Sequence, residues 1–239
     1  MLLADTKGQV AAGQLEPEIH LPATAKHAIL DYIAGELSNW RDHPDRPSEQ
    51  AEDRLTEHLC DYLNSVAYHS RHFDHFQFRT ETGDEKNASR TIDLSVKPSG
   101  ATLIIEGRRS TIFDTILPIE CKRLPTPPGT NRDHREYVFS DKKSTGGIQR
   151  FKEGNHAATH TIGAMIGYIQ RDTFEFWMAS ITEWINGLTE SSSPGWSSKD
   201  LPRLERHDQG RKVTVLSSTH ERVQPLQEIE LRHLWIQMC

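Results

Sequence analysis

Two short apolar runs carry charged residues where a buried strand would normally carry none. Residues 116–123 read ILPIECKR, and residues 91–96, TIDLSV, precede them along the chain. Side chains of a strand alternate between its two faces, so Glu120 and Lys122 project to one side while their apolar neighbours pack on the other. Burying unpaired charge is costly. Asp93, Glu120 and Lys122 therefore predict a site for a divalent cation or an anionic substrate.

This pattern resembles the PD-(D/E)xK, or restriction-endonuclease-like, nuclease superfamily. Asp93 matches the first acidic position and Glu120-Cys121-Lys122 match the ExK element, while Ile92 stands where a proline often precedes the first acid. Only this ExK element follows an apolar, strand-like run. The alternative interpretation of Glu120 and Lys122 is a coincidental salt bridge on an edge strand. An acid two residues before a lysine also occurs in three polar segments, where a solvated loop explains it: residues 5–7, 84–86 and 141–143.

The resemblance implies an α/β fold with a restriction-endonuclease-like αβββαβ core, its central mixed sheet flanked by helices. It implies that Asp93 and Glu120, with the Cys121 backbone carbonyl, hold one or two Mg²⁺ ions, for which Mn²⁺ can substitute. Lys122 would position the attacking water and offset charge on the phosphate. A glutamate of the first core helix often reaches the metal in this superfamily, and Glu52 is the candidate here. The alternative is a first-turn glutamate favoured by the helix dipole.

Apolar spacing predicts the elements around these residues. We expect an irregular arm over residues 1–22 and a single nuclease domain over 23–239, with its core at about 48–188 and an N-terminal helix and a C-terminal hairpin as additions. The expected helices cover residues 24–40, 48–67, 145–154 and 172–188. The expected strands cover residues 72–79, 91–96, 101–105, 116–123 and 162–169, and the hairpin strands 212–216 and 229–237.

The segment after the ExK element is locally basic. Eight Lys or Arg stand against four acids over residues 122–153, although the whole chain has a net charge of −6. A phosphate backbone would lie along such a segment; a charged loop without a ligand is the alternative. On the expected short helix, Gln149 would touch the attacking water or the scissile phosphate, as a Gln or Lys does in some members of the superfamily. Arg150, Lys152 and Lys143 would bind substrate phosphates.

Other function classes find little support in the sequence. No apolar stretch approaches the roughly 20 residues of a membrane span, and the start is unlike a signal peptide, so we expect a cytoplasmic protein without a membrane partner. The cysteines lack metal-ligand spacing: Cys60, Cys121 and Cys239. Gly154 argues against one helix presenting both His156 and His160 to zinc. Phosphate-loop and G-x-S-x-G motifs are absent, so neither nucleotide hydrolysis nor a serine hydrolase is indicated.

The sequence thus predicts a Mg²⁺-dependent phosphodiesterase, a deoxyribonuclease that hydrolyses DNA in line without a covalent intermediate. Family analogy alone suggests a role in prokaryotic restriction or antiphage defence, beside a companion helicase or sensor protein. Two alternatives stay open. One is a catalytically inactive module of the same fold that binds nucleic acid or protein, and the other is a nuclease directed at RNA. Oligomer formation, sequence specificity and endo- or exonucleolytic action also stay open.

Overall fold

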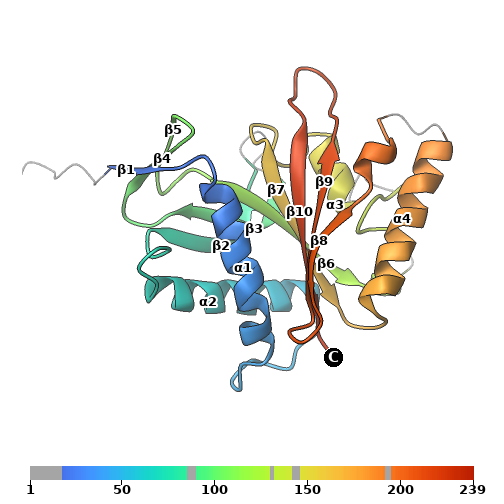
Figure 1. The fold of residues 1–239 in the computed structure, drawn as a ribbon, viewed down its shortest axis with the longest axis horizontal. Coiled ribbons are helices and arrows are strands. Elements are labelled where there is room, and N and C mark those ends of the chain that lie inside the picture. The colour runs from blue at the N-terminus through green and yellow to red at the C-terminus, as the bar shows by residue number, and fades with distance from the viewer. Residues whose placement is uncertain (1–17, 85–89, 130–131, 142–145, 192–194) are drawn as a thin grey trace, which may run out of the picture.

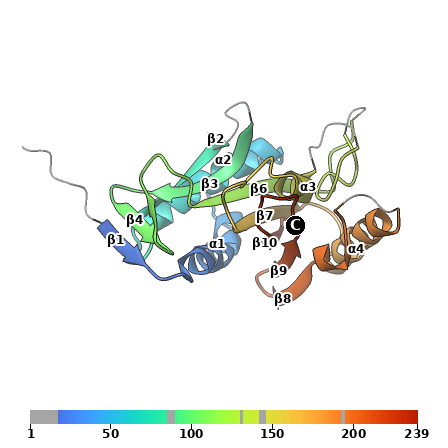
Figure 2. The same ribbon diagram turned by 90° about the horizontal axis from the view of Figure 1, so that it is seen from above.

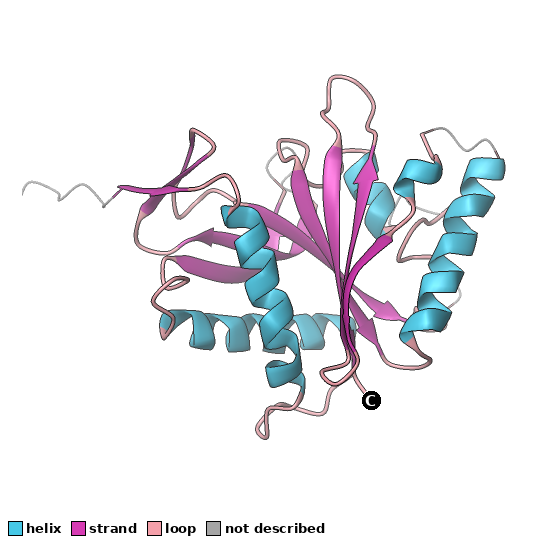
Figure 3. Ribbon diagram, in the orientation of Figure 1, coloured by secondary structure: helices cyan, strands magenta, loops and turns pink. Residues whose placement is uncertain are grey.

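The structure, a computed structural model, describes residues 18–84, 90–129, 132–141, 146–191 and 195–239 (Figure 1). Over these residues the chain is a mixed α/β protein with four α-helices, a seven-stranded mixed sheet and a separate three-stranded sheet. Figure 3 colours the helices cyan and the strands magenta. Among the described helices, none combines the length and the apolar character that crossing a membrane requires.

The large sheet has the strand order β2-β3-β6-β7-β10-β9-β8. The pairs β2/β3 and β3/β6 are antiparallel, β6/β7 and β7/β10 are parallel, and β10/β9 and β9/β8 are antiparallel again. In this spatial order the strands cover Phe76–Gly83, Thr91–Pro98, Leu117–Leu124, Ile162–Ile169, Ile229–Gln237, Val213–His220 and Arg203–Asp208.

The small sheet ties the beginning of the described chain to an insertion between β3 and β6. Strand β1 (Glu18–Leu21) pairs parallel with β4 (Thr102–Ile105), which pairs antiparallel with β5 (Arg108–Ser110). The expected irregular arm therefore ends in a strand; its residues 1–17 lie outside the described part of the chain.

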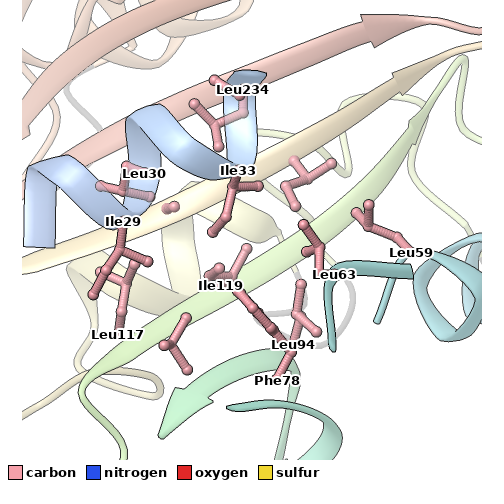
Figure 4. Packing of buried hydrophobic residues seen from close by; sticks show 14 of the residues in the cluster. Ile29, Leu30, Ile33, Leu59, Leu63, Phe78, Leu94, Leu117, Ile119 and Leu234 are labelled. Atoms are coloured by element: carbon pink, nitrogen blue, oxygen red, sulfur yellow. The ribbon is translucent and has the colours of Figure 1, made fainter. Parts of the chain in front are cut away.

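Helices cover both faces of the large sheet. Apolar side chains of α1 (Ala25–Arg41) and α2 (Glu52–Tyr68) form one core with β2, β3, β6 and β7. Those of α3 (Gly147–Lys152) and α4 (Phe174–Glu190) form a second core with β7, β9 and β10. Figure 2 shows α1 and α4 on opposite sides of β9 and β10. Figure 4 shows α1 and α2 packing on the sheet through residues such as Ile33, Leu63 and Ile119.

At the centre of the sheet, the parallel strands β6 and β7 are joined by a crossover connection that contains α3. Strand β7 reads IGAMIGYI, and all eight of its residues are buried. A continuous apolar run is typical of a strand covered on both faces, so the sequence predicts this strand with its observed bounds. The crossover places the short helix α3 on the sheet face to which Glu120 and Lys122 point.

Helix α2 begins later than expected. It starts at Glu52 after an extended N-cap at Ala51, rather than at Ser48. The reason is tertiary: the Gln50 carbonyl accepts hydrogen bonds from Arg123 NH1 at 2.9 Å and from Gln170 Nε2 at 2.7 Å. These bonds hold residues 48–51 against the ends of β6 and β7, so Glu52 occupies the first turn of the helix.

The C-terminal part is a three-stranded meander rather than a hairpin alone. Strands β9 and β10 form the expected hairpin, but β10 inserts beside β7 and β8 continues the sheet on the far side of β9. Strand β8 reads RLERHD and is almost entirely exposed, so its sequence lacks the apolar alternation that would have predicted it. Strand β2 also differs from the expected strand over residues 72–79. It begins at Phe76, because residues 72–75 form a turn.

Gly167 marks a close approach between β7 and β10. A Cβ atom there would lie 2.6 Å from Cδ1 of Trp235. That indole is 1% exposed, and its Nε1 donates a 2.8 Å hydrogen bond to the Tyr137 hydroxyl, so it has no room to retreat.

We predict that Gly167→Ala lowers the free energy of unfolding by about 1–3 kcal/mol, the usual cost of overpacking a core. Gly187→Ala is the matched control, because that glycine lies on α4 with no neighbouring atom within 4 Å of the added Cβ. The control should be neutral or stabilising by up to about 1 kcal/mol, since alanine favours a helix. Urea unfolding measures both, and equal stabilities of the two variants would contradict the predicted packing.

Candidate functional site

The candidate site lies where β3 and β6 separate. The two strands pair at Ser95 with Pro118 and at Leu94 with Ile119, and their ladder ends there. Beyond this point the N–H groups on that edge of β6 have no partner in β3. Buried backbone donors need an acceptor, and two carboxylates supply it: Asp93 Oδ2 accepts from the Cys121 N–H, and Glu52 Oε2 accepts from the Arg123 N–H, each at 2.8 Å.

The Lys122 ammonium sits at the centre of this gap with four oxygen atoms around it. Its Nζ lies 2.8 Å from Glu120 Oε1, 2.9 Å from the Cys121 carbonyl oxygen, 3.3 Å from Glu52 Oε1 and 3.4 Å from Asp93 Oδ2. The lysine side chain is 7% exposed. Asp93, Glu120, Lys122, Cys121 and Glu52, which the sequence singled out, are thus brought to one place.

Glu120 is sealed from solvent. Its side chain is 0% exposed, and besides Lys122 it contacts Arg150, whose NH1 lies 2.5 Å from Oε1, and His156, whose Nε2 lies 3.2 Å from Oε2. Oε2 accepts no well-aligned hydrogen bond from the described residues. Two cations and an imidazole therefore surround one buried carboxylate.

The two strand carboxyls have opposite electrostatic surroundings. Burial, followed by repulsion from Glu120, raises the pKa of Asp93 to about 6. Burial also disfavours ionisation of Glu120, but Lys122, His156 and Arg150 outweigh it and lower the pKa of that carboxyl. Burial alone would lower the pKa of Lys122, yet the three surrounding carboxylates raise it well above the ordinary value. Glu120 is therefore ionised beside a protonated lysine, while Asp93 changes charge near neutral pH.

An open cleft of about 310 Å³ reaches one side of this cluster. Its lining comes from the start of α2 and from β2 and β3, and five of the eight lining residues are acidic. They are Glu52, Asp53, Arg54, Thr56, Glu57, Thr80, Glu81 and Asp93. Glu120 and Lys122 are not among them, so the cleft exposes Asp93 and Glu52 while Glu120 stays closed off.

The oxygen atoms around Lys122 are of the kinds that a hard divalent cation binds. Mg²⁺ and Mn²⁺ favour carboxylate and backbone carbonyl oxygens as ligands. In this structure the positive charge among these oxygens is the Lys122 ammonium. Asp93 and Glu120, with the Cys121 carbonyl, would hold such an ion, and Glu52 stands beside them. In the described part of the chain, no group of three or more His, Cys, Asp or Glu side chains has metal-binding geometry.

The short helix α3 brings only one of its expected residues to the cluster. Arg150 reaches Glu120, but Gln149 accepts a hydrogen bond from the Ser140 N–H at 3.1 Å and donates one to Glu153 Oε1 at 2.8 Å. Lys152 pairs with Asp200 at 2.5 Å and is 7% exposed. Gln149 and Lys152 are three residues apart, which is nearly one helical turn, so they lie on one face of α3. Arg150 lies on another face.

The expected phosphate contact of Lys152 is therefore corrected: its charge is buried and neutralised by Asp200. Gln149 likewise lies outside the cluster, with both ends of its amide engaged elsewhere. Lys143 lies outside the described residues.

Lys152 also begins a buried chain of polar groups that contains an Asp, a His and a Ser. His220 Nδ1 lies 2.6 Å from Asp200 Oδ1, and Ser218 Oγ lies 2.6 Å from His220 Nε2. Ser218 also contacts His233, however, and the side chains of Asp200, His220, Ser218 and His233 are at most 3% exposed. A serine held between two imidazoles and covered by protein has no space for an acyl substrate, so the chain fastens α3 to β9 and β10.

His156 is the residue at the site that the sequence did not indicate. The chain after α3 turns back through Gly154, which has a φ of +68°, and the N–H groups of Asn155 and His156 both bond to the Arg150 carbonyl. This turn swings the His156 ring onto Glu120. Gly154 was a visible signal for the end of the helix, but the direction in which the following residues return depends on tertiary packing.

No protein-family model matches the chain, and neither a curated protein nor a solved structure was found to match it.

We predict that Asp93→Asn stabilises the protein in EDTA at pH 7.5. A carboxyl with a raised pKa opposes folding once it is ionised, so the gain is present above about pH 6 and disappears as the pH falls toward 4, the ordinary value for an unfolded aspartate. One pKa unit corresponds to about 1.4 kcal/mol. The side chain is 27% exposed, and with screening we expect a gain of about 1–3 kcal/mol.

Thermal unfolding between pH 4 and 8 measures this gain. Asp53→Asn is the control, because Asp53 lines the same cleft but is exposed in the first turn of α2. It should be neutral or slightly destabilising through the helix dipole. A destabilised Asp93→Asn protein at pH 7.5 would contradict the described charge balance.

Proposed function

We propose that this protein is a divalent-metal-dependent nuclease that hydrolyses phosphodiester bonds of DNA. The observation that carries the proposal is the set of four oxygens from Glu120, Cys121, Glu52 and Asp93 within 3.4 Å of Lys122 Nζ. An oxygen-lined site with a lysine inside it is suited to a cation that activates water beside a negatively charged substrate.

The order of the elements supports a restriction-endonuclease-like core. Along the chain α2, β2, β3, β6, α3 and β7 follow the αβββαβ order, with β4 and β5 as an insertion that joins the other sheet. The first acid lies on the second of these strands, the ExK residues on the third, and the crossover helix leads to a parallel strand. The resemblance implies the same order of elements, and this agreement in order supports the proposal.

In the proposed reaction each residue has a separate task. Asp93, Glu120 and the Cys121 carbonyl would hold Mg²⁺ or Mn²⁺, which supplies Lewis-acid polarisation of the phosphate and activation of the attacking water. Glu52 fixes the β6 backbone through the Arg123 N–H and helps to set the position of Lys122. Lys122 would orient the water and offset charge that develops on the phosphate.

The charge of the cluster suits a phosphodiester. Glu52, Asp93 and Glu120 contribute three negative charges when ionised, and Lys122 and Arg150 contribute two positive ones, so the net charge is −1. One divalent cation changes this to +1, which complements a phosphodiester monoanion. DNA rather than RNA is proposed on the family resemblance, as are the roles in restriction or antiphage defence.

We predict that Asp93→Asn and Glu120→Gln each lower Mg²⁺- or Mn²⁺-dependent cleavage by roughly 10²-fold or more, the scale of losing one preorganised electrostatic group. Glu57→Gln is the matched control, since Glu57 lines the same cleft but pairs with Arg54 at the surface. The assay uses plasmid, linear duplex, single-stranded DNA and RNA, with Mg²⁺, Mn²⁺ or EDTA.

Full cleavage by either site variant, or equal loss in Glu57→Gln, would contradict the assignment. Cleavage of RNA alone would keep the metal site but replace DNA as the substrate.

We also predict that Lys122→Ala is destabilised in EDTA and stabilised by Mn²⁺ more strongly than the wild type. Removing the ammonium leaves Glu52, Asp93 and Glu120 facing one another, and loss of one partner of a buried ion pair typically costs about 3–5 kcal/mol. A divalent ion replaces the lost charge, so the melting temperature should recover with Mn²⁺ while cleavage stays low. Calorimetry that finds Mn²⁺ binding abolished in this variant would contradict the role of Lys122.

A further inference from the structure

Arg150 differs from the other basic partners of Glu120 in its access to solvent. The Lys122 and His156 side chains are 7% and 3% exposed, whereas the Arg150 side chain is 24% exposed. Because Glu120 itself is 0% exposed, Arg150 lies between the carboxylate and water. It is the partner that can leave Glu120 without first dismantling the surrounding core.

The backbone that carries Arg150 is held firmly. Its preceding residues Gly147 and Gln149 donate backbone hydrogen bonds to the carbonyls of Glu136 and Val138, and Lys152 is fastened to Asp200. The Arg150 guanidinium can therefore move while the backbone of α3 that carries it stays in place. A change of its rotamer would remove one of the two cations from Glu120 Oε1, leaving Lys122 at 2.8 Å, while α3 stays in place.

We propose that Arg150 is a gate that couples the binding of a phosphodiester to the binding of the metal ion, an inference that rests on the nuclease function proposed above. In the free protein its guanidinium and the Lys122 ammonium both lie against Glu120 Oε1, an oxygen that the metal ion would need. When a phosphodiester enters, the guanidinium would move from the carboxylate to the phosphate, and the lone pair that it leaves on Oε1 would become available to the metal ion.

The exchange is chemically balanced. Guanidinium binds carboxylate and phosphate oxygens with the same charge-assisted geometry, so one anionic partner replaces the other. His156 Nε2 lies 3.2 Å from Oε2 and is 3% exposed, so this neighbour of the carboxylate does not depend on Arg150. By linkage, a phosphodiester that draws Arg150 off Glu120 must raise the affinity for metal, and metal must raise the affinity for the phosphodiester by the same factor. The gate thus restricts assembly of the complete metal site to the substrate-bound protein.

The test measures Mn²⁺ affinity by calorimetry on the full chain, without following cleavage. The variants are Arg150→Ala and Arg150→Gln, and the control is Arg211→Ala, which removes an exposed arginine charge 61% open to solvent near Asp208. The phosphodiester probe is dimethyl phosphate, with NaCl at matched ionic strength as the control for screening. Thermal unfolding verifies that each variant is folded.

In NaCl alone, both Arg150 variants should bind Mn²⁺ about tenfold more tightly than the wild type, within the usual range for coupled sites. Dimethyl phosphate should tighten Mn²⁺ binding to the wild type and to Arg211→Ala severalfold, and leave the Arg150 variants unchanged. Unchanged Mn²⁺ affinity in both Arg150 variants, or an equal effect of dimethyl phosphate on all proteins, overturns the gate.

Failure of the gate is distinguishable from failure of the metal site. If the Glu120→Gln and Asp93→Asn variants bind Mn²⁺ as tightly as the wild type does, the proposed metal site is wrong. The gate is then refuted together with it. If both substitutions abolish Mn²⁺ binding while those at Arg150 change nothing, the site stands and only the gate is refuted.

Discussion

The separation of β3 from β6 is the feature on which the whole candidate site depends. Where the ladder ends beyond Leu94 and Ile119, the N–H groups of Cys121 and Arg123 turn to the carboxylates of Asp93 and Glu52. Two acids from distant parts of the chain are thereby fixed by backbone hydrogen bonds rather than by one another. Continued pairing of the strands would set Asp93 against Glu120 within an ordinary ladder and leave no space for a cation between them.

That gap also explains why a cluster of charges survives in the interior. Buried carboxylates are tolerated only when their charge is compensated and their oxygens are bonded. Lys122 contacts three of them at once, and Arg150 covers Glu120 from the solvent side. Burial and the repulsion that remains raise the pKa of Asp93 to about 6. The same balance makes the site responsive, because each positive group that holds the carboxylates together competes with a metal ion for them.

The sequence predicted the parts of this site that follow from local pattern. Strand alternation placed Glu120 and Lys122 on one face, and the continuous apolar run fixed β7. Glu52 was foreseen only as a candidate, because its contact requires the late start of α2, which depends on bonds between Gln50 and residues far along the chain. Helical spacing could not decide whether Arg150 or Lys152 faces the site. Asp200, which pairs with the buried Lys152, lies 48 residues later in the sequence, after α4.

The central claim is that the oxygens around the Lys122 ammonium form a site for a hard divalent cation. X-ray diffraction from crystals soaked in Mn²⁺ tests it most directly through the anomalous signal of the metal. We expect an anomalous peak between the carboxylates of Asp93 and Glu120, beside the Cys121 carbonyl, with Lys122 Nζ displaced from its central position. A crystal saturated with Mn²⁺ in which Lys122 keeps all four oxygen contacts and no peak lies among them would contradict it.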